Sequence, residues 1–260
     1  ERNQKYKMEA ISEQKIKDYK LIFHIDDVGK NRQILNQVIK FNKLGSLKSV
    51  SILMNYGEAK EAWSYIKKYP EVKAFWHPNL TTGSPISDPK SVPSLVNSLG
   101  QFKYHTTKMA LALALRLINP NDIKTELEAQ LNLADQMGIK FRGVDGEQHI
   151  QAFEPISSFL ISKFSNVANF EFRSLGHLKS VSLVGNLKLK LMRLLARLSS
   201  PSLKMPTTWN KPFVDYYMAS WEKINLDKIN RLNLIVIHPA TSFDKINTTL
   251  KTDDHPPIKP

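Results

Sequence analysis

The chain has 260 residues, 42% of them hydrophobic and 23% charged, which is enough to bury one full core, so we expect a single domain. It has no cysteine, which excludes disulfides, thiolate metal sites and a cysteine nucleophile; any metal must bind through imidazole and carboxylate groups. The net charge of +13 favours anionic partners, but the lysines are dispersed and no arginine–aromatic surface is evident, so we expect no nucleic-acid binding.

The sequence contains no run of about 18 apolar residues without a charge, so we expect no membrane-spanning helix. It begins at Glu1 without a methionine, which is compatible with a removed leader or a longer amino terminus, and export is left open. We expect a cytoplasmic protein.

Short apolar runs alternate with longer segments of helical spacing, the pattern of strand–helix units around a mainly parallel sheet. The expected strands cover residues 20–25, 49–54, 72–76, 141–144, 170–172 and 232–237. The expected helices cover residues 31–44, about 59–68 and 122–137, and Gly45 and Gly138 end the first and the last.

The alternation predicts an irregular, single-domain TIM-like (β/α) barrel over residues 20–245. We expect an amino-terminal extension over residues 1–19 and a carboxyl-terminal tail over residues 246–260. Residues 85–121 lose the alternating rhythm, which predicts a lobe inserted above the carboxyl-end face of the barrel.

Residues 187–198 (LKLKLMRLLARL) form a leucine-rich helix that carries basic residues. Because the leucines nearly surround this helix, we expect it to be packed between the barrel and a lid, with lysine and arginine stems reaching outward. The less favoured alternative is a helix that lies on a membrane surface.

Ionisable side chains follow five of the expected strands. They are Asp26 and Asp27 after the first strand, His77 after the third, Asp145 and Glu147 after the fourth, Arg173 after the fifth and His238 after the last. Catalytic groups of α/β barrels collect at the carboxyl ends of strands, so these side chains are expected to share one site. Each alone has an ordinary structural explanation, such as a helix cap. The adjacent aspartates are the exception, because neighbouring like charges persist only beside a compensating cation or proton.

Two carboxylates and an imidazole on one rim form an open site for a divalent ion. A bound water then loses its proton more easily, and a neighbouring carboxylate can accept that proton as the water attacks a carbonyl group. His238, which we place on the opposite side of the barrel, would protonate the leaving amine. The pattern suits amide hydrolysis but does not separate it from metal-assisted phosphoester or aldol chemistry.

Several motifs occur in a characteristic order. They are HIDDVG (24–29), SVSILMN (49–55), HPNLTTGSP (77–85), VPSLV (92–96), VDGEQHIQAFEP (144–155), FEFR (170–173) and IHPA (237–240). With these motifs the chain resembles the YdjC-like carbohydrate deacetylases, the family of the chitooligosaccharide deacetylases and the HpnK-type hopanoid enzymes, from about Lys20 to Asp244.

The resemblance implies a metal-dependent hydrolase that removes an acetyl group from an N-acetylated amino sugar, with magnesium, zinc or manganese as the divalent ion. It implies that Asp26 is the general base, that Asp27 and His77 are metal ligands, and that His238 is the acid. Arg173 would orient the site.

The chain departs from the family pattern in three places. Glu147 stands where the family has its third ligand, a histidine; glutamate can bind a divalent ion, and its added charge favours harder cations. His149, two residues later, is the alternative ligand. Gln151 replaces the family's last histidine, and Phe75 with Trp76 replaces a glycine–apolar pair, so we expect a reshaped pocket floor.

The expected partner is therefore an N-acetylated sugar, in an oligosaccharide or a glycolipid. One alternative is a catalytically impaired barrel that only binds sugar; another is a peripheral membrane enzyme that reaches lipid-linked sugars through residues 187–198. The oligomeric state is left open, a homodimer included.

Overall fold

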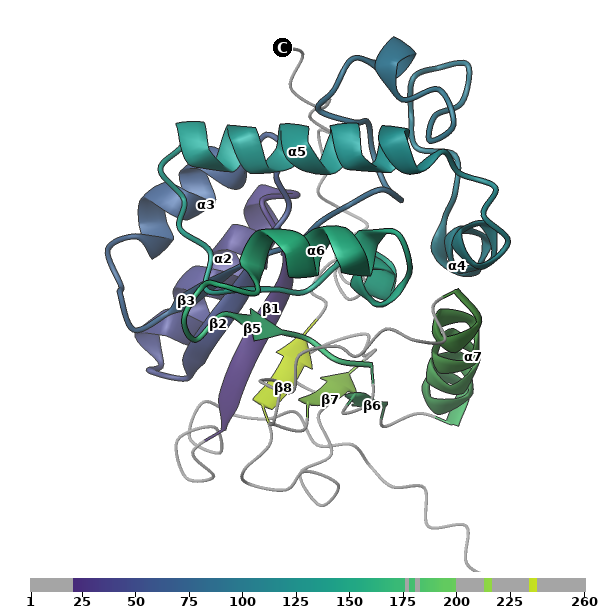
Figure 1. The fold of residues 1–260 in the computed structure, drawn as a ribbon. Helices are drawn as coiled ribbons and strands as arrows, with labels where there is room; N and C mark the ends of the chain where they lie inside the picture. Colours follow the sequence, from purple (N-terminus) through teal and green to yellow (C-terminus); the bar gives the residue numbers. More distant parts are fainter. Residues whose placement is uncertain (1–20, 176–177, 181–182, 200–212, 217–233, 238–260) are drawn as a thin grey trace, which may run out of the picture.

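The computed structural model describes residues 21–175, 178–180, 183–199, 213–216 and 234–237; the expected extension and tail lie outside these residues. Eight strands form one sheet in the order β5-β4-β3-β2-β1-β8-β7-β6, and every neighbouring pair is parallel (Figure 1). The strands are β1 Ile22–Val28, β2 Leu47–Ile52, β3 Lys73–Trp76, β4 Gly143–Val144, β5 Glu171–Phe172, β6 Leu178–Ser180, β7 Phe213–Tyr216 and β8 Leu234–Ile237.

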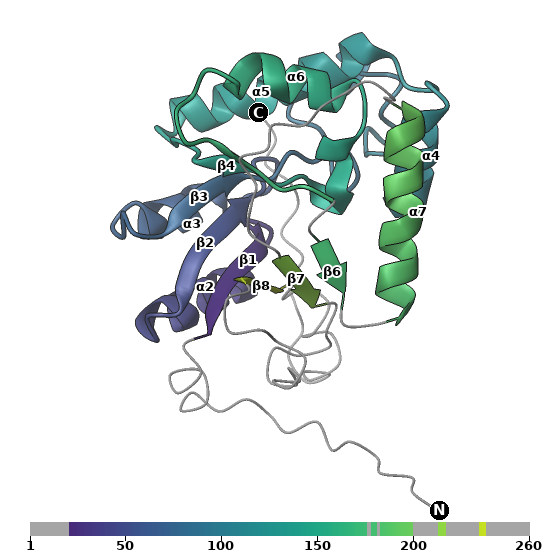
Figure 2. The same ribbon diagram turned by 60° about the horizontal axis from the view of Figure 1, so that its bottom comes forward.

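The sheet is curled like half of a barrel, and helices cover it (Figure 2). Its two edge strands, β5 and β6, are not paired with each other in the described part of the chain. The β5 edge is short, because β4 and β5 have two residues each. The predicted α/β class and parallel sheet are confirmed, whereas a closed barrel is not observed among these residues.

The predicted helices are present, with ends shifted by a few residues. The helices are α2 Arg32–Lys43, α3 Ala59–Ile66, α4 Thr106–Ala114, α5 Pro120–Gln136, α6 Ile156–Phe164 and α7 Leu183–Ser199, with 3₁₀ turns η1 Pro89–Ser91 and η2 Glu147–Ala152. The Asn31 side chain caps α2 by accepting a hydrogen bond from the Ile34 amide at 3.0 Å. Gly45 (φ +67°) and Gly138 (φ +68°) follow the ends of α2 and α5 in the left-handed conformation, as expected.

The core lies between the sheet and these helices. Phe23 of β1 packs against Phe41 of α2 with ring centroids 4.5 Å apart, and both side chains are fully buried. Ile25 and Val50, also fully buried, continue this layer along β1 and β2. The apolar packing therefore fixes the position of the central strands, whose carboxyl ends carry the polar residues.

The connection from β3 to α5 contains η1, α4 and an antiparallel bridge between Val96 and Phe102. It leaves the carboxyl end of β3 at Trp76 and includes residues 85–121, which were predicted to form an inserted lobe. Figure 1 shows this segment beyond the end of α5.

The prediction that residues 187–198 are packed between a barrel and a lid is wrong for the described structure. In α7 one face is buried, with Leu189 and Met192 each 1% exposed, but a second leucine face lies open to solvent. The apolar residues of this helix form two stripes, and only one of these stripes packs against neighbouring elements. Among the described residues, no helix is long and apolar enough to cross a membrane.

Candidate metal and catalytic site

Strand β1 carries three polar residues of the site. It runs on to Val28, so Asp26 and Asp27 lie within the strand. The sequence had suggested that they follow its end. Strand alternation places His24 on the same face as Asp26. Asp27 has φ +60°, and the pairing of β1 with β2 is irregular between Ile25 and Val28. This local break in the strand redirects the Asp27 side chain, and aspartate is among the residues that tolerate this conformation.

The first cluster joins Asp26 to three other buried side chains. His24 Nε2 lies 2.9 Å from Asp26 Oδ1 and 3.3 Å from Asp145 Oδ2. Arg173 Nη1 lies 3.0 Å from Asp26 Oδ2 and also forms an ion pair with Asp145 Oδ2. All four residues are at most 2% exposed. The guanidinium therefore lies between two carboxylates, which it neutralises and orients.

Strands β2 and β3 surround the His24 ring. Ser49 Oγ is 2.7 Å from Nδ1, and Ser51 Oγ is 2.8 Å from Nε2. The Phe75 ring meets the imidazole edge-on at 5.4 Å, whereas Trp76 packs against aromatic rings on the other face of the sheet. Phe75 thus lies against the first cluster, where a smaller residue would leave space.

The second cluster consists of Asp27, His77 and Glu147. Each offers one ligand atom, and these atoms lie within 4.8 Å of one another. His77 Nε2 is 3.1 Å from Glu147 Oε2 and 3.9 Å from Asp27 Oδ1. His77 Nδ1 donates to the backbone carbonyl of Asp145. That bond fixes the ring orientation and directs Nε2 at the two carboxylates, as in many metal-binding histidines.

The charges of the second cluster are strongly coupled. Burial acts to lower the pKa of His77, but the hydrogen bond to Glu147 and the charges of Asp145 and Asp26 outweigh it and raise this pKa to about 9. Burial acts to raise the pKa of Glu147, but His77 and Lys30 outweigh it and lower this pKa to about 2. Without a metal ion, His77 is therefore a cation at neutral pH and Glu147 an anion.

The structure groups Glu147, and not His149, with Asp27 and His77. His149 is buried and has φ +61° within η2. Gln151 bridges the site to its surroundings: its Nε2 donates to the Arg173 carbonyl at 3.0 Å, and its Oε1 accepts from the Gly146 amide at 3.1 Å.

His238 lies outside the described residues. Strand β8 ends at Ile237, which pairs with Ile25 of β1. The expectation that the last strand faces β1 from the opposite side of a barrel is therefore wrong, because β8 is the immediate neighbour of β1.

His24 is the site residue that sequence reasoning missed, and Asp145 was noted as a strand-end residue without a role. Both were recognisable in principle. His24 precedes Asp26 by two positions in an apolar strand, so the two side chains share a face. A buried, polar residue on that face is a sign of a polar cluster.

Comparison with known proteins identifies the family. The sequence profile of the family described as YdjC-like protein matches residues 20–256. The chain belongs to the YdjC-like family. This is the family that the sequence motifs suggested, and the two clusters are a feature of this member of it.

Curated relatives of this YdjC-like protein match about half of its length. The carbohydrate deacetylase of Halalkalibacterium halodurans is 30% identical over 137 residues, 53% of this chain and 56% of the relative. That of Thermoanaerobacter pseudethanolicus is 29% identical over 136 residues, 52% of this chain and 53% of the relative. The chain thus spans about half the length of the curated relatives it matches.

The fold has a counterpart among solved structures. A protein of Enterococcus faecalis V583, provisionally titled a cellobiose-phosphate cleavage protein, superposes with a TM-score of 0.51 at 21% identity. The match covers 67% of this chain and 64% of the other. It supports the α/β architecture of the YdjC-like protein.

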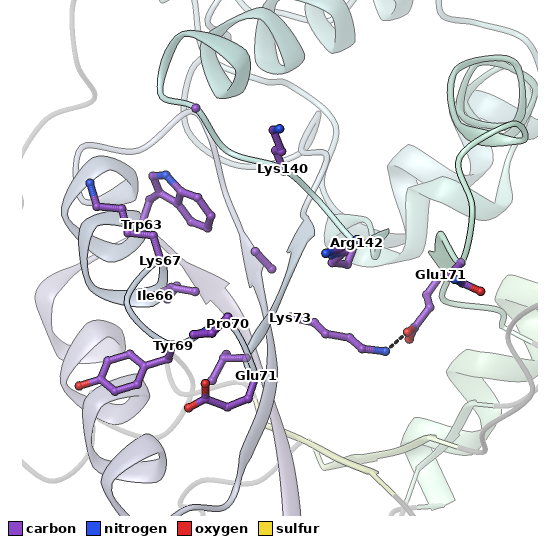
Figure 3. Close-up of a pocket in the computed structure, with 14 residues that line it drawn as sticks. Trp63, Ile66, Lys67, Tyr69, Pro70, Glu71, Lys73, Lys140, Arg142 and Glu171 are labelled. Carbon is purple, nitrogen blue, oxygen red and sulfur yellow. Dashed lines mark hydrogen bonds and ion pairs between the residues drawn. The ribbon is translucent and has the colours of Figure 1, made fainter.

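A pocket of about 520 Å³ lies away from both clusters (Figure 3). It is lined by Lys73, Arg142 and Glu171, among others, which lie at the amino-terminal ends of β3, β4 and β5. Lys73 and Glu171 form an ion pair across it. Because catalytic groups of such folds lie at the opposite ends of the strands, we assign the chemistry to the clusters and not to this pocket.

A buried polar face of α5 holds the loop that follows His77. The Glu126 carboxylate accepts hydrogen bonds from the Ile86 amide at 3.1 Å, the Ser87 amide at 2.9 Å and the Gln130 side chain at 2.9 Å. Gln130 in turn bonds both the amide and the carbonyl of Asn79. Burial raises the pKa of Glu126, against hydrogen bonds from Ser87 and Gln130 that act to lower it. The position of the loop is thus set by a helix outside the sheet.

Replacing Glu126 by alanine is expected to lower the free energy of unfolding by about 3 kcal/mol, because buried amides of the loop lose their acceptor. Glu128 is the matched control: it lies two residues later in α5, partly exposed and 3.5 Å from Lys163, and its replacement by alanine is expected to cost at most about 0.5 kcal/mol. Urea unfolding of the two variants measures the difference. Equal losses would contradict a special role for Glu126.

Proposed function

We propose that this YdjC-like protein is a divalent-metal-dependent hydrolase that removes the acetyl group from an N-acetylated amino sugar. The observation that carries the proposal is the buried group of Asp27, His77 and Glu147, with ligand atoms within 4.8 Å of one another. The name carbohydrate deacetylase of several relatives supports the same chemistry.

The donor set fits a divalent cation. Two carboxylates and one imidazole are hard to intermediate ligands, suited to magnesium, manganese or zinc. In the metal-free protein the positive charge of His77 balances the carboxylates of Asp27 and Glu147, and a bound cation would supply this charge once the ring has lost its proton. When bound, the ion would polarise the acetyl carbonyl and ease deprotonation of a water molecule.

Asp26 is the proposed general base. Its carboxylate accepts the proton of the attacking water as the water oxygen bonds to the acetyl carbon. Arg173 and His24 hold this carboxylate from two sides, so its oxygens have fixed positions. Arg173 is a positioning residue in this scheme, since it acts through Asp26 and Asp145.

The departing amine must take up a proton when the carbon–nitrogen bond breaks, and His238 is the proposed donor. The residue before it, Ile237, pairs with Ile25, the residue before Asp26. The products are acetate and the free amino sugar, with the proton of the water delivered in net terms to the amine.

A sugar-binding protein without turnover is the second candidate. It is favoured by Glu147, which stands at the family's histidine position and already pairs with His77 at 3.1 Å. Calorimetry separates the two: sugar binding without acetate release, unchanged by Asp26→Asn, would support the second candidate.

The direct test uses di-N-acetylchitobiose and longer N-acetylated oligosaccharides. Protein stripped with a chelator is expected to release no acetate, and protein resupplied with magnesium, manganese or zinc is expected to release it, as measured by an acetate assay. Failure with every ion and every substrate would overturn the proposal.

A further inference from the structure

Helix α7 presents a continuous leucine stripe to solvent. Leu183, Leu187, Leu191, Leu194 and Leu198 recur at intervals of four, four, three and four residues, which places them on one face of a helix. They are 89%, 69%, 42%, 54% and 63% exposed, respectively. Contiguous apolar surface of this kind marks an interaction site.

Helix α4 packs beside α7 and adds further exposed leucines (Figure 2). Leu111 within α4, and Leu115 and Leu117 just after it, are 47%, 58% and 61% exposed. The two helices therefore make one apolar edge of the molecule, which we call the α4–α7 surface.

The charges of this surface have one sign. Residues 106–117 and 183–199 contain six lysines and arginines and no aspartate or glutamate: Lys108, Arg116, Lys188, Lys190, Arg193 and Arg197. At about 100° per residue, Lys190 and Arg197 fall at one border of the leucine stripe. Both are exposed, whereas Arg193 donates to the Leu175 carbonyl at 2.9 Å and anchors the helix.

We propose that the α4–α7 surface docks this protein on an anionic lipid membrane. A leucine face bordered by basic side chains is the arrangement of helices that lie in the membrane interface, with apolar groups among the acyl chains and cations at the headgroups. A second copy of the chain is a poorer partner, because Lys190 and Arg197 of each copy would meet like charges, with no aspartate or glutamate in residues 106–117 or 183–199 to pair with them. The inference does not depend on the chemistry proposed for the site.

The first test is cosedimentation with vesicles of phosphatidylcholine, with and without phosphatidylglycerol. We expect binding to the anionic vesicles that falls roughly five-fold for each charge removed in Lys190→Gln and Arg197→Gln. The double variant Leu187→Ser/Leu194→Ser is expected to lower binding by at least about ten-fold. Two controls are expected to bind as wild type: Leu99→Ser, at a leucine 80% exposed elsewhere, and Lys48→Gln in β2.

The second test exploits the absence of cysteine from the chain. Single cysteines at Leu187 and Leu194 are labelled with a polarity-sensitive dye, with Lys60→Cys on α3 as the control. Anionic vesicles are expected to shift the emission of the first two dyes to the blue and to leave the third unchanged.

Three results would overturn the proposal. The first is no binding, or binding that the α7 variants do not weaken. The second is poor labelling of Leu187→Cys and Leu194→Cys without vesicles, which would show that another part of the chain covers the stripe. The third is self-association, by sedimentation velocity, that the double leucine variant abolishes, which would make a second copy the partner.

Discussion

Asp26→Asn is expected to lower kcat for acetate release by roughly 100- to 10,000-fold, because asparagine cannot accept the proton of the attacking water. Asparagine keeps the size of the side chain and one oxygen, which can still accept from Arg173 Nη1, 3.0 Å from Oδ2 in the protein; its amide nitrogen would take the place of Oδ1, which lies 2.9 Å from His24 Nε2. Affinity for an ion held by Asp27, His77 and Glu147 should change little, since Asp26 belongs to the other cluster, with His24 and Asp145. Steady-state kinetics and calorimetric metal titration measure the two quantities separately.

Asp145→Asn is the matched control for this variant. Asp145 shares both neighbours of Asp26, with its own ion pair to Arg173 and its Oδ2 3.3 Å from His24. Its expected loss in kcat is much smaller, because the proposed base remains. Equal losses in the two variants would show that the integrity of the buried charge cluster matters and would remove the case for Asp26 as base.

Asp27→Asn is expected to abolish stabilisation by divalent ions. At a free-ion concentration of 100 times Kd, wild type should gain about 2.7 kcal/mol in the free energy of unfolding. Asparagine adopts the left-handed conformation of residue 27 (φ +60°) as readily as aspartate, so the backbone is kept and one anionic ligand is lost. Denaturant unfolding with and without the ion gives the result. Asp88→Asn, at an exposed aspartate, should retain the full gain; a gain of equal size in Asp27→Asn would rule out Asp27 as a ligand.

Binding of the divalent ion is also expected to release a proton from the protein. Because the pKa of His77 is about 9 in the metal-free protein, the ring carries at neutral pH a proton that a ligand must lose. Apparent metal affinity should therefore rise about tenfold per pH unit from pH 7 and level off above about pH 9. Calorimetry in two buffers of different ionisation enthalpy counts the proton. His105→Gln, at an exposed histidine, should leave the profile unchanged; a flat wild-type profile would contradict metal ligation by His77.

Much of the fold could be predicted because each of the central strands β1, β2, β3 and β8 has at least four residues, of which half or more are apolar. The amphipathic helices α2 and α5 were predictable from their helical spacing of apolar residues. Strand β6, three residues long, carries too little pattern, and the four-residue β7 lies in a segment without a clear apolar run. The exposure of α7 could not be predicted either, since periodicity shows which residues share a face but not whether another element covers it.

The site was predictable to the extent that strand ends share an edge. Asp27, His77 and Glu147 are far apart in the sequence but lie together in the structure, as that rule requires. Whether Glu147 or His149 joins the group depends on the backbone of η2, where Gln148 and His149 have positive φ angles of 55° and 61°. The backbone propensities of glutamine and histidine do not predict two successive residues with positive φ. The proposed roles of these residues stay predictions.

The irregular end of β1 has a consequence for recombination with relatives. Asp26 and Asp27 belong to different clusters only because the chain leaves regular strand geometry between Ile25 and Val28. Just beyond, Gly29 has φ +102°, and a Cβ there would stand 2.9 Å from the Leu53 carbonyl oxygen. A chimera joined inside this segment would combine one parent's kink with the other's supporting strand and misplace both carboxylates at once. Junctions placed before residue 22 or after residue 55 would transfer the segment and its support as a unit.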